Sequence, residues 1–166
     1  MLGPIGKEVK RIYGYPTEIL ALLDDIEFAF HPNRNQYHST PILEQLAQKA
    51  PAAAVKVLAL VEVDLFIPIL THVYGEAQLG GKACIVSTIR LNEGHSYLNT
   101  QEPFLSRIVK EVIHELGHTF KLRHCKEHTC LMHYCRNEHD VDRKSDQLCR
   151  YCKVLLDDEI KRLGIK

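Results

Sequence analysis

The chain has 166 residues, and its hydrophobic (45%) and charged (25%) fractions are typical of one globular domain. Its 21 basic residues balance its 21 acidic residues, so no net charge draws the chain to nucleic acid or to an anionic membrane. It contains neither an apolar run long enough to span a bilayer nor an N-terminal signal sequence, and we therefore expect a cytoplasmic protein without membrane or nucleic-acid partners.

The first half of the chain predicts short helices and strands separated by polar segments. A threonine followed by proline favours a helix start, because the hydroxyl caps the first turn and proline suits its first position. A long β-branched run is the best candidate for a central strand. In chain order we expect a helix over 18–23, a strand over 26–30, a polar loop over 33–40, a helix from Thr40-Pro41 to about residue 51, and the central strand over 55–63.

The second half predicts a hairpin and two longer helices. Two apolar runs separated by Leu79-Gly80-Gly81 indicate the hairpin, because glycines suit a tight turn. An amphipathic run farther on predicts a long helix, and the chain after it is polar and irregular up to a last helix. The expected elements are strands over 72–78 and 83–89, and helices over 103–120 and 151–163. With the first half, they predict an α/β (mixed α+β) fold built on a mixed, twisted sheet.

The segment His114-Glu115-Leu-Gly-His118 predicts a metal site on the long helix. The two histidines stand four residues apart and therefore project from the same face. His124 follows after six more residues, so the helix must end and the chain must turn back for a third ring to join them. Three neutral imidazoles with one open position are typical of a catalytic zinc, and Glu115 lies near enough to take a proton from a bound water.

Five of the six cysteines lie in the last third of the chain. Cys149 and Cys152 form a CxxC pair, and Cys125 with Cys130 supplies a wider pair, in which Cys135 is an alternative to Cys130. In a reducing compartment such clusters indicate metal before disulfide, and four thiolates make a closed structural zinc site. The alternatives are free, half-buried cysteines or a redox-active CxxC.

The two predicted sites are adjacent, because His124 and Cys125 are consecutive residues. Little in the polar segment after the helix could hold His124 by packing alone. A structural zinc contributes about 10 kcal/mol or more of folding free energy in small sites, so a zinc bound to Cys125 would fix the backbone of His124. We therefore predict that the loss of Cys149 loosens the catalytic metal, which Cys149 does not contact.

Together these motifs resemble the archaemetzincin family of zinc metallopeptidases. The shared pattern is HExxH with a third histidine six residues on, a cysteine pair with four residues between, a methionine two residues later, and a CxxC. The segments 35–40 and 75–82 also resemble the family, so the likeness spans most of the chain. It implies a compact metzincin-like domain with a catalytic zinc, a Met-turn and a second zinc held by four cysteines, hence two Zn²⁺ ions per chain.

The resemblance assigns a role to each matching residue. Glu115 would be the general base, and Met132 the Met-turn residue beneath the zinc. The implied ligands are His114, His118 and His124 for the catalytic zinc, and Cys125, Cys130, Cys149 and Cys152 for the structural zinc. We expect one domain over 1–166, with the sheet and helices in 1–100, the metal-binding helix and turn in 101–124, and the Met-turn, cysteine site and last helix in 125–166.

Lys121 departs from the family pattern, which has glycine three residues after the second histidine. Glycine suits a corner with positive φ, whereas another residue there loses roughly 1–2 kcal/mol. Three zinc–imidazole bonds outweigh that penalty, so metal binding should survive. The lysine also brings a cation near the zinc, which we expect to disfavour or reshape substrate access.

Tyr134 follows Met132 in a Met-x-Tyr arrangement that resembles other metzincins, in which the tyrosine stabilises the tetrahedral intermediate. A surface or packing role is the alternative. The remaining polar candidates are interpreted as solvated surface and Cys84 as a core residue. The solvated residues are His128, His133, His139, Asp157, Asp158 and the basic residues over 121–126.

The sequence supports three functions. The first is a zinc-dependent metallopeptidase in which Glu115 takes the proton of a zinc-activated water and passes it to the leaving amine, with an extended peptide or protein substrate beside an edge strand in 72–89. The second is a zinc-binding module with weak or no peptidase activity, which Lys121 supports. The third is a zinc knuckle, formed by the cysteine-rich region, that docks on nucleic acid or on another protein. The balanced net charge argues against nucleic acid as its partner. We expect a monomer.

Overall fold

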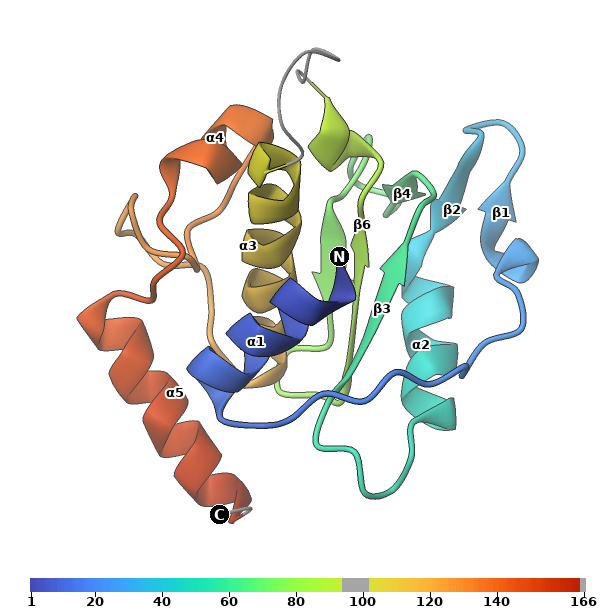
Figure 1. Cartoon of the computed structure of the whole chain (residues 1–166). Helices are drawn as coiled ribbons and strands as arrows, with labels where there is room; N and C mark the ends of the chain where they lie inside the picture. The colour runs from blue at the N-terminus through green and yellow to red at the C-terminus, as the bar shows by residue number, and fades with distance from the viewer. Residues whose placement is uncertain (94–101, 165–166) are drawn as a thin grey trace.

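The computed structural model describes residues 1–93 and 102–164, which fold into α-helices packed on two small sheets (Figure 1). The elements are α1 (Leu2–Tyr13), the 3-10 helix η1 (Glu27–Ala29), β1 (Phe30–His31), β2 (Gln36–His38), α2 (Ser39–Lys49), β3 (Val57–Val61), β4 (Leu65–Phe66), β5 (Gly75–Ala77), β6 (Ala83–Ser87), the 3-10 helix η2 (Arg90–Asn92), α3 (Glu102–Thr119), α4 (Glu138–Arg143) and α5 (Arg150–Leu163). One sheet has the order β1-β2-β4 and the other β3-β6-β5. None of the described helices combines the length and apolarity that a membrane span requires.

β6 is the central strand of the second sheet. It pairs in parallel with β3 and antiparallel with β5, and all five of its residues are buried. β3 lies inside the run 55–63 but is mostly only half-buried, so the prediction that this run is the central strand was wrong. β6 takes the centre because its small and apolar side chains can be covered on both faces.

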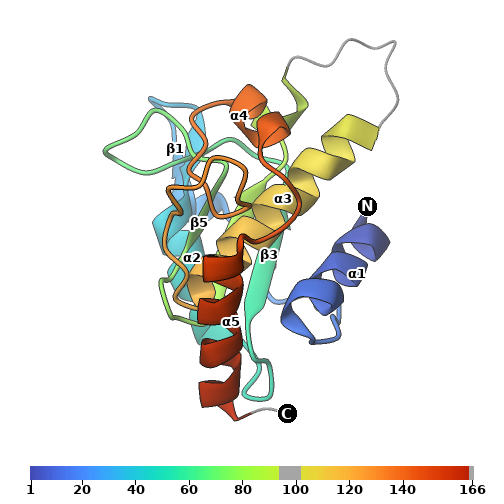
Figure 2. The same ribbon diagram turned by 90° about the vertical axis from the view of Figure 1, so that its left-hand side faces the viewer.

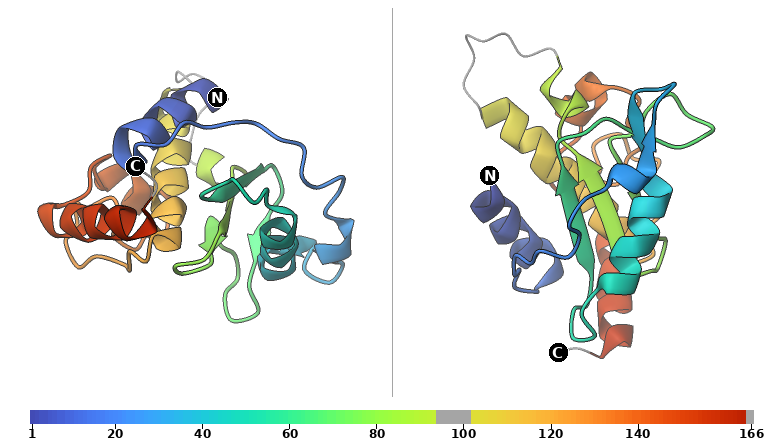
Figure 3. Two further views of the ribbon diagram at one scale, coloured as in Figure 1. Left: turned by 90° about the horizontal axis from the view of Figure 1, so that it is seen from below. Right: turned by 90° about the vertical axis from the view of Figure 1, so that its right-hand side faces the viewer.

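Helices cover the two faces of β6, and its side chains alternate between them. Cys84 and Val86 point into a core shared with α1 and α3, whereas Ala83 and Ile85 point into a core shared with α2. Figure 3 shows β3 and β6 between α2 on one side and α1 with α3 on the other. Cys84 is fully buried, as the sequence predicted.

α1 was not predicted, and the helix expected over 18–23 was wrong, because 14–26 contains neither helix nor strand. Two glycines and a proline in the first turns of α1 hid its pattern, since both residue types are poor helix formers. Its stripe is nonetheless regular: Ile5, Val9 and Tyr13 are buried at intervals of four residues. Tertiary packing on α3 therefore stabilises a helix that propensity alone disfavours.

Three further expectations need correction. Most of the strand expected over 26–30 is the 3-10 helix η1, with only β1 following it. α2 begins at Ser39 rather than at Thr40, and the hydroxyls of these two residues donate to Glu76 in β5 (2.5 and 2.9 Å) instead of capping the helix. α4 lies where the chain was expected to be irregular. The hairpin of β5 and β6 and the helices α3 and α5 confirm their predictions.

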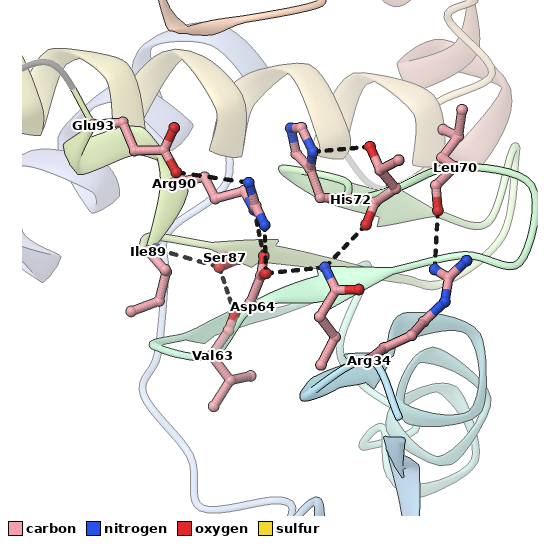
Figure 4. A network of polar contacts seen from close by, with 11 residues as sticks. Arg34, Val63, Asp64, Leu70, His72, Ser87, Ile89, Arg90 and Glu93 are labelled. Atoms are coloured by element: carbon pink, nitrogen blue, oxygen red, sulfur yellow. Dashed lines mark hydrogen bonds and ion pairs between the residues drawn. The ribbon is translucent and has the colours of Figure 1, made fainter. Parts of the chain in front are cut away.

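A polar network fastens the segments that follow β3 and β6. The carboxylate of Asp64 accepts two hydrogen bonds from the guanidinium of Arg90 (2.6 and 2.7 Å), and the Ser87 hydroxyl donates to the Val63 carbonyl (2.6 Å) (Figure 4). The network lies at the carboxyl end of β6. The site described next lies elsewhere on this sheet, beside β5 and the first part of β6.

Candidate metal centres

Three histidines converge at the carboxyl end of α3. The Nε2 atoms of His114 and His118 lie 3.1 Å apart, and one nitrogen of each of these rings and of His124 lies within 4.8 Å of the others. Two ligands of a tetrahedral zinc with bonds of about 2.0–2.1 Å stand about 3.3 Å apart. The donor set therefore fits zinc with one position left open.

Backbone carbonyls orient two of the three rings. The Nδ1–H of His114 donates to the Leu131 carbonyl (3.0 Å), and the Nδ1–H of His118 donates to the Leu122 carbonyl (2.7 Å). Each bond fixes the tautomer that leaves Nε2 free for a metal. Among the described residues, none donates to or accepts from the imidazole of His124, which is exposed and packs near the Tyr134 ring (centroids 5.1 Å apart).

The surroundings favour neutral imidazoles. Burial lowers the pKa of His114 well below its usual value, and Lys144 and His118 add to the effect. Burial also lowers the pKa of His118 and of His124. Because only the neutral ring can bind a metal, these shifts keep the site ready for metal at a pH near neutrality.

Glu115 is buried beside the histidines. Burial raises the pKa of its carboxyl well above the usual value, Glu111 adds to the rise and Lys144 opposes it. Gly75 in β5 makes room for this side chain, because a Cβ there would lie 2.7 Å from Glu115 Cγ and 2.6 Å from the Ile85 carbonyl oxygen. Any larger residue at position 75 would displace the carboxylate or the strand.

A buried ion pair that the sequence analysis missed lies one turn before Glu115. Lys144 Nζ contacts Glu111 Oε1 at 2.7 Å, and the two side chains are 0% and 5% exposed. Glu111 is four residues before Glu115 on the buried face of α3, so a charged residue in an apolar stripe was the available signal. The pair ties the chain after α4 to the helix that carries two metal ligands.

Lys121 occupies the corner at which the chain leaves α3, and its φ of +64° is the left-handed conformation predicted for this position. Its ammonium pairs with Glu159 of α5 at 2.7 Å, and Lys121 does not line the hollow beside the histidines. The expectation that Lys121 brings its cation to the catalytic zinc was therefore wrong. The ion pair instead joins the corner to the last helix.

The segment 130–133 belongs to the orange stretch of chain that leads from α3 to α5 in Figure 2, and its Leu131 carbonyl contacts His114. Met132 is fully buried, and a Cβ on Gly117 would lie 2.5 Å from its sulfur, so the methionine packs directly on the helix between the two histidines. The Met132 carbonyl accepts a hydrogen bond from the Cys125 N–H (2.9 Å). Because the Leu131 carbonyl orients His114, this one segment contacts both predicted centres.

Four cysteines form the second cluster. The sulfur atoms of Cys125, Cys130, Cys149 and Cys152 lie within 4.8 Å of one another, and those of Cys125 and Cys149 are 3.8 Å apart. Sulfur ligands of a tetrahedral zinc with bonds of about 2.3 Å stand about 3.8 Å apart. All six cysteines are free thiols. The structure thus groups Cys130 with the others and leaves Cys135 outside.

Backbone N–H groups favour the thiolate form of Cys149, whereas burial raises the pKa of Cys130 and of Cys152. Burial raises the pKa of Cys149, but hydrogen bonds from the Cys152 N–H and from the neighbouring thiols outweigh it, so the pKa is lowered overall. Cys149 is also the N-cap of α5, where the helix dipole stabilises an anion. Outside the cluster, burial raises the pKa of Cys135 to about 11, although Lys144 opposes the rise.

A hollow of about 430 Å³ opens beside the three converging histidines and is lined by Ala77, Leu79, His118, Arg123 and His124. Arg123 was interpreted only as solvated surface. It is exposed, but it borders the hollow between the ligands and β5. Sequence spacing gave no signal for this, because β5 and the residues after α3 meet only in the folded chain.

The other candidates lie on the surface. Tyr134 is 46% exposed beside His124. His139, Asp157 and Asp158 are exposed, as expected. His128 is exposed, as expected. His133 is not the solvated residue that the sequence predicted, because it is half-buried and its Nδ1–H donates to the Cys125 carbonyl (2.8 Å), while its Nε2 lies 3.2 Å from His128 Nδ1.

The chain was compared with known proteins. The model of peptidase family M54 matches residues 10–158. Among curated relatives, the archaemetzincin of Methanopyrus kandleri is 38% identical over 138 residues, covering 83% of this chain and 75% of that protein. The archaemetzincin of Methanocaldococcus jannaschii is 35% identical over an alignment that covers 92% of this chain and 83% of that protein.

Solved structures agree in fold. The crystal structure of archaemetzincin from Methanopyrus kandleri superposes with a TM-score of 0.83 at 33% identity, covering 97% of this chain and 86% of that one. Archaemetzincin from Archaeoglobus fulgidus, complexed with malonate, gives a TM-score of 0.78 at 30% identity and covers 93% and 90% of the two chains. The similarity extends over the whole α/β fold described above.

Proposed function

This chain belongs to peptidase family M54, the archaemetzincin family of zinc metallopeptidases, and from that premise we propose that it hydrolyses peptide bonds with Glu115 as general base and two zinc ions. The observation that carries the proposal is the convergence of three neutral imidazoles beside a buried glutamate. Location in the cytoplasm and a monomeric state stay predictions from the sequence.

We propose that His114, His118 and His124 hold the catalytic ion. When bound, zinc supplies Lewis acidity, which polarises a carbonyl and acidifies a water molecule. The two carbonyl-anchored rings fix its position on the helix side. His124 completes the set from the far side of the corner, and its exposed ring leaves the open position accessible from solvent.

Glu115 would accept the proton of the attacking water and return it to the leaving amine. Burial raises the pKa of its carboxyl, which disfavours the charged form when no cation is near. A cation held by the neighbouring histidines would favour the carboxylate, because an opposite charge nearby lowers the pKa of an acid. The base would therefore be formed when the site is loaded.

We further propose that Tyr134 donates its hydroxyl to the oxyanion that develops on the scissile carbonyl. Its ring lies beside His124, and the residue is nearly half exposed, so it is accessible from solvent next to that ligand. A phenol that meets charge only in the transition state accelerates the chemical step more than it aids binding.

A substrate strand would pair with β5. In the described structure β5 is bonded to β6 on one edge, and its other edge has no strand partner. Ala77 and the nearby Leu79 line the hollow beside the ligands, so a peptide extended along this edge would pass the metal site. Backbone pairing of this kind binds a chain without demanding one sequence.

The alternative function, a zinc-binding module without peptidase activity, rested on Lys121. Its ammonium is engaged by Glu159, and the backbone at this position has the corner conformation that the family glycine suits. Lys121 therefore gives the alternative less support than its sequence position suggested, and we prefer the peptidase.

A digest of unstructured peptides tests the proposal. The zinc-loaded protein should cleave them, a chelator should abolish cleavage, and Glu115→Gln should reduce kcat about 10²–10⁴-fold while two zinc ions per chain remain. Glu138→Gln, which removes a carboxylate from α4, is the matched control. Cleavage by Glu115→Gln at the wild-type rate would remove Glu115 from the mechanism, and no cleavage by the wild type would favour the binding module.

A further inference from the structure

The hollow beside the catalytic histidines has one charged wall. Two of its five lining residues, His118 and His124, belong to the proposed metal site, and two more, Ala77 and Leu79, are apolar. The fifth is Arg123, whose guanidinium is permanently cationic and carries five N–H donors. Any group of a substrate that enters this hollow therefore meets the metal centre and a cation together.

Within the part of the chain that the structure describes, Arg123 has no hydrogen-bond or ion-pair partner, in contrast to Lys121 and Lys56 nearby. Lys121 pairs with Glu159, and Lys56 donates to the carbonyls of Gly81 and Thr119 (2.8 Å each). Across residues 1–93 and 102–164, no carboxylate forms an ion pair with Arg123. Its donors are available to a ligand.

The backbone of Arg123 is held on both sides. The carbonyl of Leu122 accepts the hydrogen bond that orients His118, and the next residue, His124, is a proposed ligand. Zinc binding at His118 and His124 would thus fix the origin of the Arg123 side chain relative to the scissile bond. A cation held in this way selects substrates by position as well as by charge.

We propose that Arg123 makes this hollow a subsite for a carboxylate, so that the enzyme prefers peptides with a negative group next to the scissile bond. This inference rests on the proposed peptidase function. The guanidinium presents two parallel N–H donors that match the two oxygens of a carboxylate, and the apolar wall of β5 strengthens the attraction by displacing water. An acidic side chain and the terminal carboxylate of a short peptide share this chemistry.

Matched peptides separate the two sources of the carboxylate. One arm compares Glu with Gln at each position flanking the cleaved bond, and the other compares a free with an amidated C-terminus. We expect kcat/KM for the preferred carboxylate peptide to exceed that for its neutral match roughly tenfold, as for a partly exposed charged hydrogen bond. The preference should shrink as salt rises, because exposed charges are screened.

Variants assign the preference to Arg123. Arg123→Gln should lower kcat/KM for the carboxylate peptide to that for its neutral match, whereas Arg123→Lys should keep part of the preference because a point charge lacks the paired donors. Arg143→Gln, which removes an exposed arginine from α4, should retain the full preference. Equal use of charged and neutral peptides by the wild type, or an unchanged preference in Arg123→Gln, would overturn the inference.

A binding measurement distinguishes this failure from that of the proposed function. The zinc-loaded Glu115→Gln protein is titrated with the fluorescently labelled Glu and Gln peptides, with and without Arg123→Gln. Tighter binding of the Glu peptide that depends on Arg123, without cleavage by the wild type, would refute the peptidase and keep the carboxylate subsite. Cleavage by the wild type with no preference between the Glu and Gln peptides would support the peptidase and refute the carboxylate subsite.

Discussion

The two metal-binding clusters are built in opposite ways. In the histidine centre, a long packed helix supplies two ligands, and backbone carbonyls orient their rings. In the cysteine centre, two ligands come from the chain after α3 and two from the N-cap and first turn of α5. Cys130 and Cys152 are buried in the main core, whereas Cys125 and Cys149 are only half-buried, and we expect a metal to hold these two in place.

The two clusters meet at one peptide bond. His124 is the only proposed histidine ligand outside α3, and it lacks the carbonyl anchor that His114 and His118 have. Its neighbour Cys125 belongs to the other cluster and is also held by the Met132 carbonyl. We therefore expect the catalytic centre to depend on the structural one for its third ligand, and the reverse dependence to be weak.

The largest expected effect is a one-way loss of metal. Cys149→Ser should lose the structural zinc and lower catalytic zinc occupancy as well, because the anchor of His124 is released, whereas His118→Ala should lose only the catalytic ion. Metal per chain, measured by elemental analysis after dialysis, tests this. Cys135→Ser is the control thiol outside both clusters. Full retention of the catalytic zinc in Cys149→Ser would contradict the prediction that the histidine centre depends on the cysteine centre.

The second-largest expected effect concerns α3, the helix that carries two of the three histidines. Glu111→Gln would leave Lys144 buried without a charge partner, which costs about 3–5 kcal/mol of unfolding free energy. Because the pair lies under α3, and its cysteine neighbour is Cys135 rather than a member of the four-cysteine cluster, the structural zinc should stay bound in the folded protein. Chemical denaturation of the loaded protein measures the loss. A change below about 1 kcal/mol, as for an exposed pair, would show that the buried pair does not anchor the helix.

A smaller effect tests the open face of the histidine centre. Tyr134→Phe should lower kcat roughly 10- to 100-fold with little change in KM, because an oxyanion donor acts mainly in the transition state. Tyr151→Phe, on the exposed surface of α5, is the matched control. An equal kcat for Tyr134→Phe and the wild type would assign Tyr134 to packing against His124.

The smallest expected effect is at Lys121, the corner where the chain leaves α3 and continues toward the cysteine cluster. Lys121→Ala should lose the ion pair to Glu159 and keep the strained φ, while Lys121→Gly loses the pair but relieves roughly 1 kcal/mol of strain. The glycine variant should therefore unfold at higher denaturant concentration than the alanine variant, and both should stay within about 1 kcal/mol of the wild type. The opposite order would mean that the corner is not strained.

Local spacing predicted the chemistry of both clusters. A four-residue interval places His114 and His118 on one helix face. Two pairs of cysteines indicate a closed zinc site whatever the conformation of the chain between the pairs. The positive φ at Lys121 followed from the need for a corner. These features depend on neighbours in the sequence, which is why the sequence alone could predict them.

What spacing could not predict depends on distant contacts. α1 forms against α3 despite its glycines, and Lys144 finds Glu111 across 33 positions of the chain. The central place of β6 follows from helices on both of its faces, and Arg123 meets β5 only after the hairpin has packed on α3. In each case tertiary packing decides between local alternatives that the sequence leaves nearly equal.

The segment from Cys130 to His133 has an evolutionary consequence. Besides the Cys130 thiol and the Met132 side chain, it contributes main-chain atoms to both clusters, since the Leu131 carbonyl orients His114 and the Met132 carbonyl holds Cys125. Main-chain oxygens are present whatever the side chain, so Leu131 can be substituted as long as the interior stays filled. An inserted or deleted residue would instead move every acceptor out of register at once. Descendants of this protein should therefore keep the number of these four positions even where the side chain at position 131 varies.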